Sequence, residues 1–66
     1  MSVARVTELS AMSNTSFEDA IQQAITRATQ TLRNVTGAWV KEQRITVENG
    51  SISQYQVNLQ VTFVLE

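Results

Sequence analysis

Residues 54–66 read QYQVNLQVTFVLE, and every odd position from Tyr55 to Leu65 is apolar. The even positions from Gln54 to Thr62 carry only side-chain amides and one hydroxyl. Such alternation is typical of a β-strand with one apolar face. Amides on its other face are unusual, because a solvated strand face normally carries Lys and Glu. We therefore expect neighbouring subunits to use this polar face.

The length of this segment also points to assembly. A strand over residues 54–66 would reach about 40 Å at roughly 3.3 Å per residue. A compact chain of 66 residues should have a radius of gyration of only about 11 Å. The strand is therefore too long for an isolated globular monomer.

The composition limits both the ways in which so short a chain can be stabilised and the partners that it can bind. The 66 residues form one small domain without Cys or His, so disulfides are absent and structural zinc is not expected. Oligomerisation is the remaining source of stability. A net charge of −1 with five scattered basic residues gives no footprint for nucleic acid or for a membrane surface. No signal peptide or apolar run of about 18 residues is recognisable, so a soluble cytoplasmic protein is expected.

A helix is predicted to begin at Ser16, whose hydroxyl can cap the first turn while Glu18 and Asp19 complement the helix dipole. Asn and Gly in residues 34–37 can adopt the left-handed conformation that ends helices. Between these limits, apolar side chains recur at three- and four-residue steps and form one stripe of about five turns: Phe17, Ala20, Ile21, Ala24, Ile25, Ala28, Leu32 and Val35.

Two further strands are predicted, over residues 3–9 and 38–47, with a polar loop over residues 10–16. The Asn49-Gly50 pair suits a type I′ turn, which would make the second and third strands antiparallel neighbours. The order is β-α-β-β. We therefore predict an α+β fold, a three-stranded antiparallel sheet wrapped around one helix, as a single domain over residues 1–66.

The sequence does not favour an enzyme. Without His or Cys, most general bases and nucleophiles are missing. No Asp-rich loop suggests a calcium site, and two glycines cannot make a glycine-rich phosphate loop. No metal-ligating residues are therefore assigned.

Trp39 is the most informative aromatic residue. It has the strand parity of Lys41 and Gln43, opposite Ala38 and Val40, so it should point away from the core. An exposed Trp is favoured as an anchor against another subunit. The alternative is a stacking surface for a planar ligand, with the amide of Gln56 on the neighbouring strand binding the ligand's edge.

Four segments of the sequence match a known protein family, and the spacing between them is also that of the family. They are SFEDAI (16–21), RATQTLRN (27–34), EQR (42–44) with Gly50 at the family's spacing, and YQV (55–57) running on to VTFVLE (61–66). In these the chain resembles the dodecins, small flavin-binding proteins whose β-α-β-β subunits form a hollow dodecamer. The resemblance covers nearly the whole chain. It implies a homododecamer that stores or buffers FMN or riboflavin.

The resemblance also indicates site residues. In flavin-binding dodecins a tryptophan begins the second strand, and two copies related by a two-fold axis sandwich a pair of isoalloxazine rings. Gly37 occupies that position here. Trp39 lies two residues on, about 7 Å away on the same strand face, and is hypothesised to take over the stacking. Gln56 matches the family's ring-binding glutamine, and Arg44 a strand-two arginine that would contact phosphate or another subunit.

Two more departures occur on the third strand, where Thr62 and Val64 replace the glycine and arginine common in bacterial flavin binders. Loss of one aromatic contact costs about 1–3 kcal/mol, so flavin binding is expected to be weakened by Gly37. Dodecin-like proteins without the tryptophan include a subgroup called calcium dodecins. The alternative function is therefore a flavin-free dodecameric shell with a structural or ion-binding role.

Overall fold

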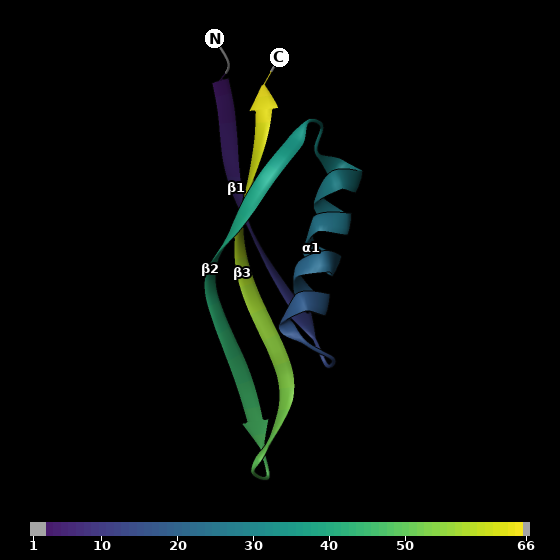
Figure 1. Ribbon diagram of the computed structural model, residues 1–66, viewed down its shortest axis with the longest axis vertical. Helices are drawn as coiled ribbons and strands as arrows, with labels where there is room; N and C mark the ends of the chain where they lie inside the picture. Colours follow the sequence, from purple (N-terminus) through teal and green to yellow (C-terminus); the bar gives the residue numbers. More distant parts are fainter. Residues whose placement is uncertain (1–2, 66) are drawn as a thin grey trace.

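The computed structural model describes residues 3–65 and has the element order β-α-β-β. Its elements are β1 (Val3–Ser13), α1 (Phe17–Thr31), β2 (Val35–Glu48) and β3 (Ser51–Leu65). The three strands form one antiparallel sheet in the order β1-β3-β2, with α1 against one face (Figure 1). The predicted α+β fold is confirmed, with the alternating segment as the central strand.

The core lies between α1 and the middle of β3. Val57, Leu59 and Val61 are fully buried, Leu59 with only 1% of its surface exposed, as their odd parity predicted. The helix presents three small residues to them, Ala20, Ala24 and Ala28, which are also buried. Small side chains let the helix backbone approach the sheet closely, so branched side chains on β3 can fill the space between them.

The start of α1 follows the predicted cap. The hydroxyl of Ser16 accepts the backbone N–H of Asp19 at 3.0 Å. The Asp19 carboxylate in turn accepts the hydroxyl of Ser13 at 2.6 Å and the side-chain amide of Gln23 at 2.7 Å. The bond from Ser13 fastens the end of β1 to the first turn of the helix, and the other two stabilise the helix start itself.

The predicted boundary between the first strand and the loop that follows it was wrong. The first strand was expected to stop at Leu9, but β1 continues to Ser13, which pairs with Tyr55. Residues 10–13 are therefore strand rather than loop. Pairing with the long β3 stabilises them despite their weak β-propensity, because tertiary context overrides local preference.

The helix also ends earlier than predicted. Its last residue is Thr31, and the Leu32 N–H closes it by donating to the carbonyl of Ala28 at 2.8 Å. Asn34 adopts the left-handed conformation (φ 60°), and Val35 begins β2 opposite Phe63. The apolar stripe predicted a longer helix because Val35 packs against the same core from the strand. β2 accordingly runs from Val35 to Glu48, whereas the prediction placed this strand over residues 38–47.

The β2–β3 turn has the conformation that the Asn49-Gly50 pair predicted. Asn49 (φ 52°) and Gly50 (φ 78°) both lie in the left-handed region. A type I′ turn requires positive φ at both central residues. The turn therefore fixes the register of the hairpin.

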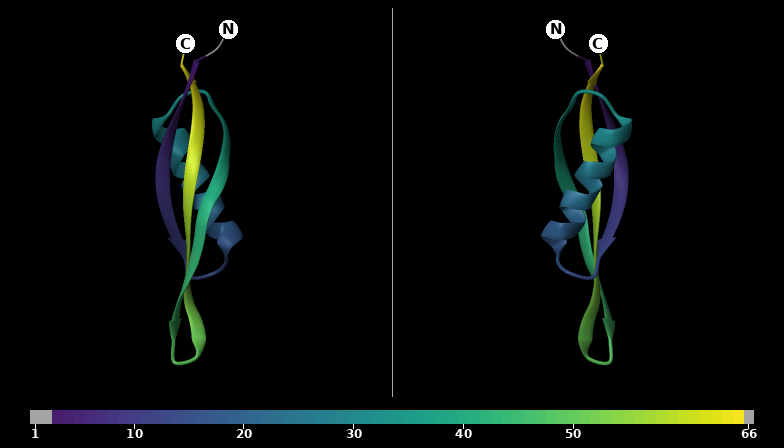
Figure 2. Two further views of the ribbon diagram at one scale, coloured as in Figure 1. Left: turned by 90° about the vertical axis from the view of Figure 1, so that its left-hand side faces the viewer. Right: turned by 90° about the vertical axis from the view of Figure 1, so that its right-hand side faces the viewer.

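The molecule is long and narrow, measuring 52 × 19 × 13 Å with a radius of gyration of 13.7 Å. The β2–β3 hairpin extends well beyond the helix (Figures 1 and 2). There Ile45, Val47 and Ile52 remain exposed. Phe17 packs edge-on against Tyr55, with ring centroids 5.1 Å apart, near the limit of the helical cover. Much of the apolar sheet surface is thus bare in one copy.

A β-bulge in β2 changes which residues share a face. The register shifts between Val40 and Glu42, so Lys41 has no Cα partner on β3. Beyond the bulge, Gln43 lies opposite buried Val57 and Arg44 opposite Gln56. The prediction that Gln43 shares a face with Trp39 was therefore wrong, because simple alternation does not survive an inserted residue.

Within residues 3–65, α1 is too short and too polar to cross a lipid bilayer.

The two glycines provide a matched stability test. Gly50→Ala should lower the free energy of unfolding by about 1–2 kcal/mol per subunit, because an L-residue is strained at positive φ. Gly37→Ala is the control, since a Cβ there meets no atom within 4 Å and no strain is expected. Urea unfolding followed by circular dichroism at fixed protein concentration measures both. An equal loss of stability in the two variants would contradict this account.

Candidate functional site on the outer face of the sheet

We define the outer face as the side of the sheet opposite α1. The antiparallel register arranges its side chains in rows that cross all three strands. Trp39 on β2 lies opposite Gln60 on β3, and Gln60 lies opposite Glu8 on β1. Side chains on one face stand roughly perpendicular to the sheet. Trp39 therefore stands in a row with an amide and a carboxylate.

Polar contacts connect the side chains of Gln60, Glu8 and Lys41 in and beside the row of Trp39. Gln60 Nε2 donates to Glu8 Oε1 at 3.1 Å. Lys41 Nζ lies 3.5 Å from the same oxygen, and both charged side chains are about half exposed. The ion pair spans β3, which is possible because the bulge lets the Lys41 side chain reach over the outer face. It places a cation and an anion side by side close to Trp39.

Two further amides of β3 also have partners, Asn58 within its own row and Gln56 in the adjacent row. Asn58 Nδ2 donates to Glu42 Oε1 at 3.1 Å, and Gln56 Nε2 donates to Ser10 Oγ at 3.0 Å. Together with Gln60, these amides join β3 to both outer strands. The amide face is therefore partly satisfied within one copy. Among residues 3–65, no hydrogen bond uses the side-chain oxygen of Gln56 as acceptor.

Trp39 lies on the outer face, as its opposition to Ala38 and Val40 predicted, and 53% of its surface is exposed. The register does not place it beside Gln56. Gln60 is its direct neighbour, and Gln56 lies four residues away along β3, about 13 Å at the usual rise.

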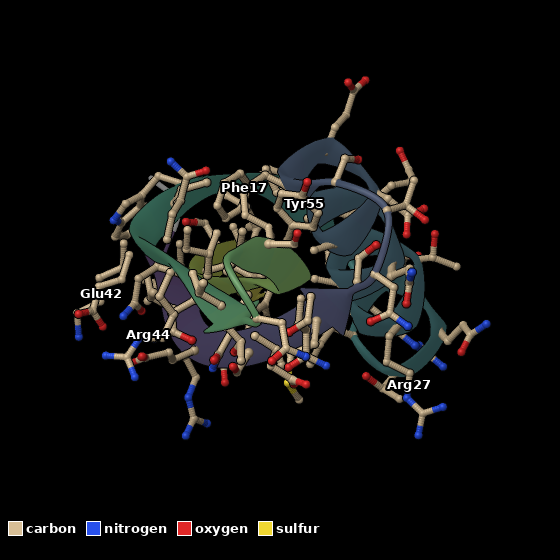
Figure 3. The ribbon with its side chains drawn as sticks, turned by 90° about the horizontal axis from the view of Figure 1, so that it is seen from below. Phe17, Arg27, Glu42, Arg44 and Tyr55 are labelled. Carbon is tan, nitrogen blue, oxygen red and sulfur yellow. The ribbon has the colours of Figure 1, made fainter. Side chains whose placement is uncertain are left out.

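Gly37 and Arg44 lie on β2 on either side of Trp39 in the sequence. Gly37 lies opposite Thr62, in open space that a side chain could enter. Arg44 lies opposite Gln56, and its side chain points outward on the same side as Glu42, away from α1 (Figure 3). Within residues 3–65, Arg44 forms no ion pair. It is thus an accessible cation on the outer face.

Sequence reasoning missed Glu8, Lys41 and Gln60 as possible contacts of a ligand at Trp39. Glu8 is 31 positions away from Trp39 in the sequence and reaches the same row only through the β1–β3 register. Lys41 depends on the bulge. Only the position of Gln60 on the polar face of its strand was visible in the alternation.

A small hollow beside the start of α1 is lined by Ser16, Glu18, Asp19 and Gln22. Asp19 already accepts a hydrogen bond from Ser13 of β1 and one from Gln23 within the helix. We assign this hollow to capping. Within the described part of the chain, no three His, Cys, Asp or Glu residues are grouped so that they could hold a metal ion.

The family model that matches the chain is that of dodecin, over residues 3–66. A dodecin of Thermus thermophilus is 44% identical over 59 residues, which covers 89% of this chain and 86% of the relative. The crystal structure of an arginine-to-alanine variant of the T. thermophilus dodecin has a TM-score of 0.93 at 39% identity, covering 100% of this chain and 98% of the other.

Two structures from other organisms are also similar. Dodecin from Streptomyces coelicolor has a TM-score of 0.91 at 37% identity, covering 98% of this chain and 93% of that one. A calcium dodecin from Mycobacterium tuberculosis, described as a calcium-chelating antigen with a novel calcium-binding site, has a TM-score of 0.82 at 32% identity. It covers 97% of this chain and 91% of that chain.

The ion pair in the row of Trp39 should contribute little to stability. Lys41→Met is expected to change the free energy of unfolding by less than about 1 kcal/mol, because exposed pairs gain little over their hydration. Urea unfolding of the two proteins at one concentration checks this. A loss of several kcal/mol would show that the pair is a structural element of the sheet.

Proposed function

The chain belongs to the dodecin family, and from this premise we propose that it binds a small planar ligand between copies of itself in a homododecamer. FMN or riboflavin is the first candidate, and the role is storage or buffering. Family membership supports small-molecule binding by an oligomer. The flavin, the number of subunits and the residues in contact are our proposals.

The observation that carries the proposal is the exposure of Trp39 on the outer face. A large aromatic side chain with 53% of its surface exposed is costly to leave in water, since burial of apolar area contributes about 25 cal/mol per Å². The flat π-face of an indole binds planar rings. We therefore assign ring stacking to Trp39.

Gln56 and Arg44 would serve the ligand from a second position. Their shared row lies about 13 Å from Trp39 along β3. We propose that Gln56 reaches a ring stacked on Trp39 from a different copy, related by a two-fold axis. Its free side-chain oxygen would accept an N–H at the ring edge. Arg44, without an ion pair among residues 3–65, would hold a phosphate or a neighbouring subunit.

Gly37 is expected to limit affinity. It stands where the family resemblance places the stacking tryptophan, and the space beside it is open. One missing aromatic contact costs about 1–3 kcal/mol, and a two-fold site repeats the loss. We therefore propose binding weaker than in a dodecin that carries the tryptophan.

We propose a binding protein and not an enzyme. The chain has no His and no Cys, which are the usual general bases and nucleophiles. The carboxylates of the outer face are engaged by amides, as for Glu8 and Glu42. Nothing in this arrangement pairs a nucleophile with a base.

The second candidate is a flavin-free shell with a structural or ion-binding role. Two observations favour it. Three amides of the outer face, those of Gln56, Asn58 and Gln60, already donate within one copy, and a relative at 32% identity is described as a calcium dodecin. In such a shell Trp39 would only pack against another subunit.

Particle mass and flavin fluorescence, measured together, test the proposal. We expect one size-exclusion peak far above 7.4 kDa that quenches added FMN fluorescence at micromolar concentration. Trp39→Ala should abolish the quenching and leave the particle intact, because the indole contacts ligand and not only protein.

Two other outcomes of these measurements would contradict the proposal. If Trp39→Ala loosens the particle and the parent protein quenches no flavin, the flavin-free shell is supported and the proposal of flavin binding is contradicted. A stable 7.4 kDa species would contradict assembly and, with it, any site between copies.

Gly37→Trp provides a gain-of-function test. It should tighten FMN binding by about tenfold or more, because a restored stacking contact contributes about 1–3 kcal/mol. The open space beside Gly37 can take the new side chain. Gly37→Leu is the control, since it adds apolar volume without a π-face. Equal gains in the two variants would argue against stacking at this position.

A further inference from the structure

Trp39 stands in a row that ends in a charged pair. Across the strand from it lies Gln60, and beyond Gln60 lies Glu8, whose Oε1 also contacts Lys41 Nζ at 3.5 Å. The Cα atoms of Trp39 and Glu8 are separated by two strand spacings, about 10 Å. This is within the span of a fused heterocycle held between their side chains.

A ring stacked on Trp39 must present an edge to these groups. Strand side chains stand roughly perpendicular to the sheet, so a ring stacked parallel to an indole held in this way would turn its rim toward the sheet surface. The rim then meets Lys41 and Glu8 together with the amide of Gln60. The chemistry of this row therefore selects the edge of the ligand.

The row offers donors beside acceptors. Lys41 can only donate, and the Glu8 carboxylate can only accept, through two oxygens. One oxygen, Oε1, is engaged by Lys41 and Gln60; among residues 3–65 no hydrogen bond uses the other. The complementary ring edge carries a carbonyl, then a ring N–H, then an amino group. The carbonyl faces the ammonium and the two donors face the carboxylate.

We propose that the row of Trp39 selects a fused planar heterocycle with the 2-amino-4-oxo edge of pterins, which corresponds to the 2-amino-6-oxo edge of guanine, over one with a 2,4-dioxo edge. The inference rests on the proposed ligand binding at Trp39. A 2,4-dioxo edge, which the flavins proposed above on family grounds also carry, would turn its second carbonyl toward Glu8, so a flavin would bind this row with one mismatched contact and a pterin with none. Two acceptors then face each other without a proton, and an unmatched polar contact of this kind costs about 1–3 kcal/mol.

Pterin and lumazine form a matched pair of probes, because they share the fused ring and differ in the 2-amino or 2-oxo group. Equilibrium dialysis of the assembled protein at neutral pH, with absorbance detection, measures each. The parent protein should bind pterin about tenfold or more tightly than lumazine. Glu8→Gln should abolish or reverse that preference, because an amide offers one acceptor and one donor, which match the N–H and carbonyl of lumazine.

Glu42→Gln is the control variant. Glu42 is also a carboxylate that accepts an amide N–H at 3.1 Å from β3, but it lies in another row. The ratio of the pterin to the lumazine affinity should stay unchanged in this variant. A ratio near one in the parent protein would overturn the inference. So would an unchanged ratio in Glu8→Gln, or an equal shift in both variants.

A failure of the edge selection can be distinguished from a failure of the proposed ligand binding. If FMN binds through Trp39 and pterin has no advantage over lumazine, only the edge selection is wrong. If FMN, pterin and lumazine all fail to bind the intact particle, the ligand site and the inference built on it are both overturned.

Discussion

Helix α1 and strand β3 each contain 15 residues, yet they cannot cover each other. A helix rises about 1.5 Å per residue and a strand about 3.3 Å, so α1 spans roughly 22 Å against roughly 50 Å of β3. The close contact of Ala24 with the centre of the sheet completes one small core. Apolar side chains at both ends of the sheet, Ile52 and Leu65 among them, stay exposed. We propose that assembly covers the apolar surface that this difference in length leaves exposed.

The bulge at Lys41 has consequences for chemistry. Without the extra residue, the alternation of β2 would put Trp39 and Arg44 on opposite faces. With it, both lie on the outer face, and Lys41 reaches Glu8 across the central strand. Bulges commonly re-aim side chains near binding sites. Here one inserted residue turns a strand face into a surface with aromatic, cationic and anionic groups.

The outer face is organised as rows because the sheet is antiparallel and in register. The amides of Gln56, Asn58 and Gln60 each donate to a side chain on β1 or β2. These exposed bonds add little stability individually, but they restrict the rotamers of their partners. A surface whose polar groups are held in place binds a rigid planar ligand at lower entropic cost. The order of these polar groups therefore supports the proposal that this face binds a planar ligand.

The sequence by itself determined the long alternating strand, the capped helix start at Ser16, the Asn49-Gly50 turn and the outward position of Trp39, but not that this strand lies in the centre of the sheet. Each depends on contacts between residues a few positions apart, or on strand parity. Only the tertiary structure decided that β1 continues to Ser13, that Val35 belongs to a strand and that Gln60 and Glu8, with Lys41 beside Glu8, share the row of the tryptophan. These depend on strand register and on a bulge, which join distant residues and leave no periodic trace in the sequence.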